Sequence, residues 1–208
     1  YTTLQLPKQG IGEWCHPTLT ADIDDSGIRA QVRSGLLSTS LGVPFHTPAE
    51  GKNIAFTSLW DNYPDSLTIP LTGKASHAYL LLAGSTNHMQ CHIANGVIRV
   101  HYADGTSETL ELINPDNWCP IEQDFYVDGI AFCLQTPRPY RLHFKSGLVS
   151  NNLEKDLNIT GVYGRSIDGG AGVLLDMLLD PHKELKSLTL ETLSNDVVIG
   201  IMGITLQK

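Results

Sequence analysis

Residues 97–113 read VIRVHYADGTSETLELI, and this stretch gives the strongest local indication of the fold. Over residues 97–102, Val97 and Arg99 alternate with Ile98, Val100 and Tyr102. A period of two is typical of a strand with one buried face. Asp104-Gly105 supports positive φ and is a strong hairpin signal. The stretch therefore predicts two antiparallel strands, residues 97–102 and 106–113.

The rest of the chain has the same character, with short apolar runs separated by Gly, Pro, Asn and Asp. Further runs lie at residues 53–59, 66–71, 77–83, 129–134, 138–144, 172–179, 186–192 and 197–206. Strand after strand with little helix predicts an all-β fold, an antiparallel β-sandwich or jelly roll. The composition changes near residue 43. We expect residues 1–43 to be a lead-in packed on the sandwich or the remnant of a preceding domain, and residues 44–208 to be the sandwich.

Composition narrows the classes of partner. The 208 residues include 22 acidic and 14 basic ones, for a net charge of −8. A nucleic-acid binder needs a basic surface, so nucleic acid is not an expected partner. No apolar run approaches the roughly 20 residues of a membrane span, so no membrane insertion is expected. The four cysteines, Cys15, Cys91, Cys119 and Cys133, form no C-x-x-C pair, and we expect free, largely buried thiols.

Several phrases support a narrower assignment when they are taken together. They are IAFTSLWDNYP (54–64), IPLTGKA (69–75), YLLLAG (79–84), NG (95–96), YADGT (102–106) and SNDVVIGIMGITL (194–206). This order resembles the galactose-binding-like jelly-roll modules appended to large bacterial glycoside hydrolases. More narrowly, it is similar to the C-terminal domain of uncharacterised secreted Bacteroides-type proteins with rhamnosidase-like regions.

The resemblance implies a galactose-binding-like jelly roll over about residues 44–206. It also implies a periplasmic or extracellular bacterial location and contact with neighbouring domains of a parent protein. Its motifs are mainly structural, namely hairpin glycines and core strands. Members of this fold bind sugars, bind calcium structurally, or do neither, so the fold does not determine the function.

Trp60, Asp61 and Asn62 form the first candidate carbohydrate site, in a loop that follows a predicted strand. A flat apolar ring stacks on the C–H face of a sugar, and short polar side chains bind its hydroxyls. Loops on a rigid scaffold often carry such binding residues. The alternative is that Trp60 covers the core while Asp61 and Asn62 form a turn through local hydrogen bonds.

Two further loops offer similar chemistry. Asn87 and His88 lie in the polar stretch 85–90, after a very apolar run, and could exchange hydrogen bonds with a neutral ligand. Trp118, in the loop 114–124, is a candidate sugar platform. The alternatives are a polar connection between strands for the first loop, and a structural loop held to the sheet by Trp118 for the second.

Catalytic and metal-binding chemistry is weakly indicated. Asp116, Glu122 and Asp124 lie in one short loop, and paired carboxylates about 5–10 Å apart are what a glycosidase needs. A short loop meets that distance by chance, so no catalytic residue is assigned. Residues 22–27, DIDDSG, resemble the start of a calcium loop but have no Glu at the far end. We expect no cofactor, but the sequence leaves open that a calcium ion is bound in a structural role.

The expected function is thus a non-catalytic accessory domain of a larger polysaccharide-processing protein, with weak carbohydrate binding. A purely structural or interaction module is one alternative, and it predicts that Trp60 and Trp118 are mostly buried. A small glycoside hydrolase is the other. It requires two convergent carboxylates in a cleft, with the pKa of one raised.

Overall fold

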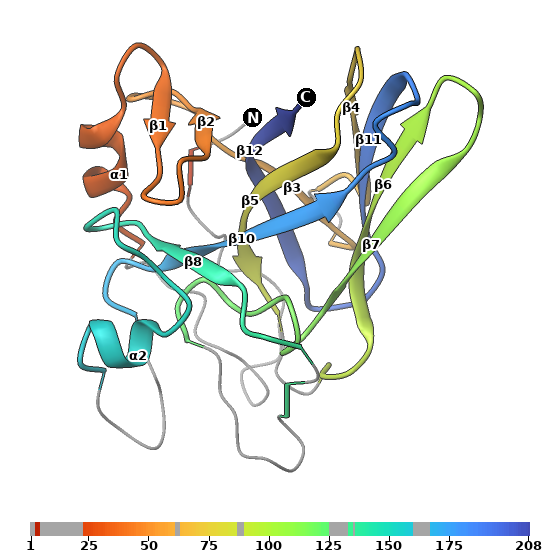
Figure 1. Cartoon of the computed structure of the whole chain (residues 1–208). Coiled ribbons are helices and arrows are strands. Elements are labelled where there is room, and N and C mark those ends of the chain that lie inside the picture. The colour runs from red at the N-terminus through yellow and green to blue at the C-terminus, as the bar shows by residue number, and fades with distance from the viewer. Residues whose placement is uncertain are drawn as a thin grey trace.

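The computed structural model describes residues 3–4, 23–60, 63–86, 90–124, 133–134, 136–159 and 167–208. This portion of the chain folds into a six-stranded and a four-stranded antiparallel sheet that share a hydrophobic core (Figure 1). The prediction of an all-β sandwich is therefore confirmed. Helix is limited here to α1 (Ser26–Gln31) and α2 (Leu153–Asp156).

The last three strands of the chain are inserted between earlier ones. The six-stranded sheet has the order β3 (Ala55–Ser58), β12 (Val198–Gln207), β5 (His77–Ser85), β10 (Ala171–Leu178), β8 (Tyr140–His143) and β9 (Val149–Ser150). The four-stranded sheet has the order β4 (Ser66–Pro70), β11 (Leu185–Thr192), β6 (Ala94–Tyr102) and β7 (Ser107–Ile113). Each of β10, β11 and β12 thus pairs on both sides with strands that precede it in the chain.

The hairpin predicted from the Asp-Gly signal joins β6 to β7. Gly105 has a φ of +87°, and the Asp104 carboxylate accepts the Thr106 N–H at 2.9 Å. Ile98 lies opposite Leu110 across the two strands. This prediction is therefore confirmed, with β6 beginning three residues earlier than the alternation indicated.

The core between the sheets follows the alternation of side chains. Ala78, Leu80 and Leu82 of β5 face Ile98 and Val100 of β6, and all five are fully buried. Because burial of one such aliphatic side chain is worth about 1.5–3 kcal/mol, this layer supplies much of the stability of the fold.

A third layer covers part of the outer face of the six-stranded sheet. It is formed by α1, β1 (Leu36–Ser38) and β2 (Pro44–His46), and it buries Ile28, Leu37 and Phe45 against Leu81 and Ala83 of β5. The middle of β5 is therefore buried on both faces, which explains its continuous apolar run. β1 and β2 pair with each other across residue 43, where the composition changes.

No helix in the described residues is long and apolar enough to cross a membrane. Cys91, Cys119 and Cys133 are free thiols, while Cys15 lies outside the described residues. Cys119 is buried and the other two are half-buried. Burial raises the pKa of the Cys119 thiol to about 12, so it stays protonated and inert near neutral pH.

Candidate functional site

Trp60 lies at the end of β3 and packs against the cluster beneath the third layer. Its ring is half-buried, and its centroid lies 6.3 Å from that of Tyr63 at an interplanar angle of 60°. The Tyr63 N–H donates to the Trp60 carbonyl at 3.0 Å, which closes the turn. The other two residues of this candidate site, Asp61 and Asn62, lie outside the described residues.

The second candidate loop is described only at its two ends. Asn87 and His88 lie outside the described residues. Thr86 before them is fully buried and donates to the Asn95 side-chain oxygen at 2.5 Å, and Gln90 after them bonds to the Asn195 carbonyl. The ends of this connection are thus held by polar contacts within the sandwich.

Trp118 does not form a carbohydrate platform, which corrects the expectation for this residue. Its side chain is 0% exposed and belongs to the core between the two sheets. The adjacent Asn117 holds the loop to β7, since its side chain accepts the Ile113 N–H and donates to the Glu111 carbonyl, each at 2.8 Å. A ring buried on both faces has no surface on which a sugar can stack.

Two of the three loop carboxylates that a hydrolase would use, Glu122 and Asp124, are buried, and the third, Asp116, is half-buried. Asp124 is 3% exposed, forms an ion pair with Arg141 at 3.6 Å and accepts the Glu154 N–H at 2.8 Å. Glu122 is 7% exposed, and no other described residue donates a hydrogen bond to its carboxylate oxygens. Burial raises the pKa of Glu122 to about 7, although its own backbone N–H and the Arg141 charge oppose the shift. The raised pKa of Glu122 is what a general acid in a glycoside hydrolase requires. Glu122 and Asp124 are nevertheless both enclosed by protein, so a substrate cannot reach them.

The aspartates of the calcium-like stretch take part in local structure. Asp24 accepts the Ser26 N–H at 3.0 Å, and Asp25 pairs with Arg29 at 2.8 Å and accepts from the Asn53 amide at 2.8 Å. Asp22 lies outside the described residues. Among the residues that the structure describes, no three His, Cys, Asp or Glu side chains are placed to hold a metal ion.

A different surface gathers aromatic and polar groups, on the area of the six-stranded sheet that the third layer leaves uncovered. We call it the outer-face patch. Its residues come from four adjacent strands and are His77 and Tyr79 of β5, Tyr140 of β8, Asp176 and Leu178 of β10, and Gln207 of β12. The strand register places Asp176 beside Tyr79, and both Leu178 and Gln207 beside His77. The patch is thus a direct product of strand pairing.

Hydrogen bonds and ring stacking order the middle of this patch. The His77 and Tyr79 rings are parallel within 5°, with centroids 5.7 Å apart. The Tyr79 hydroxyl donates to the Gln207 side-chain oxygen at 2.7 Å. His77 Nδ1 lies 2.7 Å from a carboxylate oxygen of Asp176, and because a carboxylate only accepts, Nδ1 is the donor. Four side chains on three strands therefore form one pre-ordered row.

A groove of about 310 Å³ runs along one side of the patch. Tyr79, Tyr140 and Asp176 line it from the sheet, and Leu41 and Val43 line it from the β1–β2 hairpin. Tyr140 is 43% exposed, so its ring offers a face to a ligand. The groove is mainly apolar with a few polar groups, which is the usual composition of a site for a small ligand.

Local sequence patterns do not reveal this patch, although they place strands over most of its residues. The only local signal is that His77 and Tyr79 alternate with the core residues Ala78 and Leu80. That alternation indicates an outward face but not what lies beside it. The partner Asp176 is 99 positions from His77, and Gln207 is 128 positions from Tyr79.

Comparisons with known protein families, with curated proteins and with solved structures find no match to this chain. The resemblance to galactose-binding-like modules therefore stays a prediction. The geometry of the outer-face patch is the basis on which a function can be proposed.

Proposed function

We propose that this chain is a non-catalytic β-sandwich domain that binds carbohydrate weakly through the outer-face patch. The pre-ordered row of Gln207, Tyr79, His77 and Asp176 is the observation that carries the proposal. Ring faces pack against the C–H groups of a sugar, while carboxylate and amide groups exchange hydrogen bonds with its hydroxyls. Because the row is already ordered, a ligand loses little further side-chain entropy on binding.

The wider setting of the proposal comes from the resemblance. We propose that the domain belongs to a larger polysaccharide-processing protein, outside the cytoplasm of a bacterium, and that it orients neighbouring domains on their substrate. The Asp176 carboxylate within the row supports a neutral glycan at this patch rather than an anionic one, since it repels a negative ligand there.

The first test is binding of the purified chain to a glycan array, with and without calcium, including rhamnose- and galactose-containing pectic fragments. Reproducible binding would support the proposal, and a dependence on calcium would identify a role for the ion. A blank array in both conditions would overturn it.

Substitutions on the patch then locate the site. We expect Tyr79→Ala and Tyr140→Ala each to weaken glycan binding about five- to tenfold, which corresponds to loss of one stacked ring. His77→Ala has a matched control in His101→Ala, since His101 lies on β6 of the other sheet. Titration calorimetry with the glycan that binds most tightly on the array measures the affinity of both histidine variants. Equal binding by the two histidine variants would contradict the assignment of the site.

One observation favours a second function for the same face. Leu178, at the end of the patch, is 72% exposed, and an apolar side chain in that position suits contact with another protein domain. In that case Leu178→Ser would weaken association with a neighbouring domain of the parent protein even when no glycan is present. Co-purification of the two domains as separate chains measures this effect.

A further inference from the structure

A second groove opens at the seam between the two sheets, on the side where β3 and β4 form the sheet edges. β3 pairs with β12 only from Val198 to Ile201, whereas β12 continues to Gln207. Beyond Ile201 no described strand pairs with β12 on that side. The short β3 therefore leaves the interior of the sandwich open between β12 and β4.

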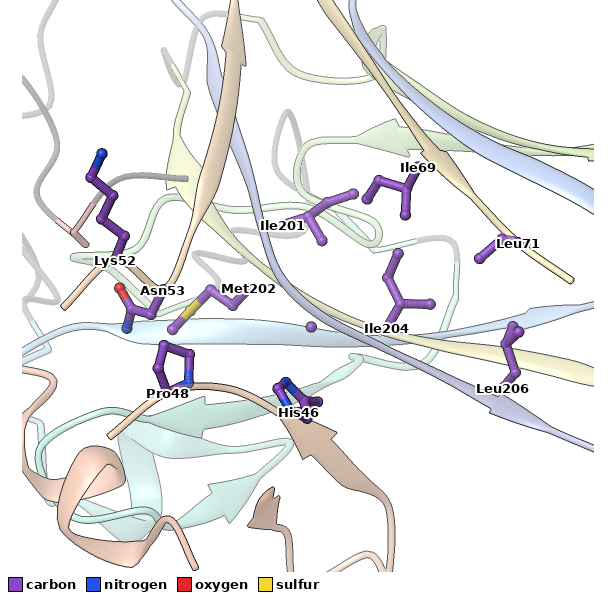
Figure 2. A pocket seen from close by; sticks show the side chains of 11 residues that line it. His46, Pro48, Lys52, Asn53, Ile69, Leu71, Ile201, Met202, Ile204 and Leu206 are labelled. Carbon is purple, nitrogen blue, oxygen red and sulfur yellow. The ribbon is translucent and has the colours of Figure 1, made fainter. Parts of the chain in front are cut away.

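This seam groove has a volume of about 500 Å³ (Figure 2). Its apolar end is lined by core-facing side chains of the two strands, namely Ile201, Ile204 and Leu206 of β12, Ile69 of β4 and Leu71 just after it. Ile69, Leu71, Ile204 and Leu206 are only partly buried. Apolar surface left in water costs roughly 25 cal/mol per Å², so a hydrocarbon that covers it gains free energy.

The opposite end of the groove carries polar groups and a positive charge beside the apolar side chains of Pro48 and Met202. His46, Lys52 and Asn53 line it, and Figure 2 shows Lys52 and Asn53 well separated from Leu71 and Leu206. Both side-chain groups of Asn53 are already used, by the Leu4 N–H and by Asp25. Lys52 is exposed, and none of the ion pairs within the described residues includes it.

We propose that the seam groove binds an aliphatic carboxylate, with its hydrocarbon chain between β4 and β12 and its carboxylate at Lys52. The volume lies within the usual range of small-ligand sites, about 300–1,000 Å³. An apolar slot with an exposed cation at its mouth is complementary to a ligand with an apolar body and a single negative head. The proposal is independent of carbohydrate binding, since no residue of the outer-face patch lines this groove.

The test uses the intact chain with labelled isoleucine δ1-methyl groups, titrated with decanoate and followed by NMR. We expect shifts at Ile69, Ile201 and Ile204, with Ile28 under the third layer unmoved. Shortening the acid to octanoate and then hexanoate should weaken binding about two- to fourfold for each CH₂ removed. Decyltrimethylammonium, which has the same chain with a cationic head, should bind more weakly than decanoate.

Lys52→Gln tests the head-group contact without touching the core. We expect it to weaken decanoate binding about two- to fivefold, the range of an exposed ion pair. Lys74→Gln is the matched control, because Lys74 is exposed and pairs loosely with Glu184 at 4.0 Å, outside the groove. Decanoate that leaves the three methyl groups unshifted would overturn the proposal, as would equal binding of the anionic and cationic amphiphiles.

Discussion

Replacing Trp118 with alanine is expected to lower the free energy of unfolding by about 3–5 kcal/mol. The side chain is 0% exposed and fills the space between the two sheets, close to the backbone of Gly84. Its removal leaves a cavity that the two surrounding sheets close only incompletely, because both are fixed by strand pairing. The loss of dispersion contacts then adds to the loss of apolar burial.

Urea denaturation followed by circular dichroism measures this effect, and two variants control for it. Trp118→Phe retains an apolar ring and should lose much less stability. Trp60→Ala removes a half-buried tryptophan at the surface and should also lose less than Trp118→Ala. An unchanged urea midpoint for Trp118→Ala would show that this ring does not support the core.

Glu122 is expected to make the chain less stable as the pH rises from about 4.5 to 7. Burial raises the pKa of this carboxyl from 4.5 to about 7 in the folded chain. Between these values the folded chain holds a proton on Glu122 that the unfolded chain has lost. Stability from this group is therefore fully present below pH 4.5 and is lost as the pH passes 7, by about 3 kcal/mol in all.

Glu122→Gln should remove this pH dependence, because the neutral amide mimics the protonated acid in shape. We expect similar stability of the two proteins at about pH 4.5 and a more stable variant at about pH 8, by about 3 kcal/mol. Urea titrations at several values between about pH 4.5 and 8 measure the difference between the proteins. Glu108→Gln on the exposed part of β7 is the control and should follow the wild type. Parallel curves for wild type and Glu122→Gln would refute the assignment.

Local patterns predicted most of the strands and one hairpin. They did not predict β1, β2 or β9, and the strand predicted at 129–134 lies largely outside the described residues. Alternation and the Asp104-Gly105 turn act within a few residues, and the β6–β7 hairpin forms as they predict. The outer-face patch could not be predicted from local patterns. Its row depends on which strands become neighbours, and a single sequence does not specify pairing between Tyr79 and Gln207, 128 positions apart.

Trp118 shows a second limit of reasoning from sequence. A tryptophan among Asn, Pro and Asp residues has the composition of an exposed loop, and that composition suggested a binding platform. The loop instead folds back on β7 through Asn117, which carries the ring into the core. Whether a loop aromatic points inward is decided by the space left between the sheets, and local composition does not report that space.

The order of strands in the two sheets also has a consequence for how the chain folds. Because β10, β11 and β12 are each inserted between earlier strands, both sheets stay divided until residues 171–207 have left the ribosome. Pairings of such long range place the chain among slow folders, with times of about milliseconds to seconds. Until then β5 presents two unpaired edges along a very apolar strand, which is the kind of surface that aggregates. Nascent chains that stall before β10 would therefore depend most on chaperones.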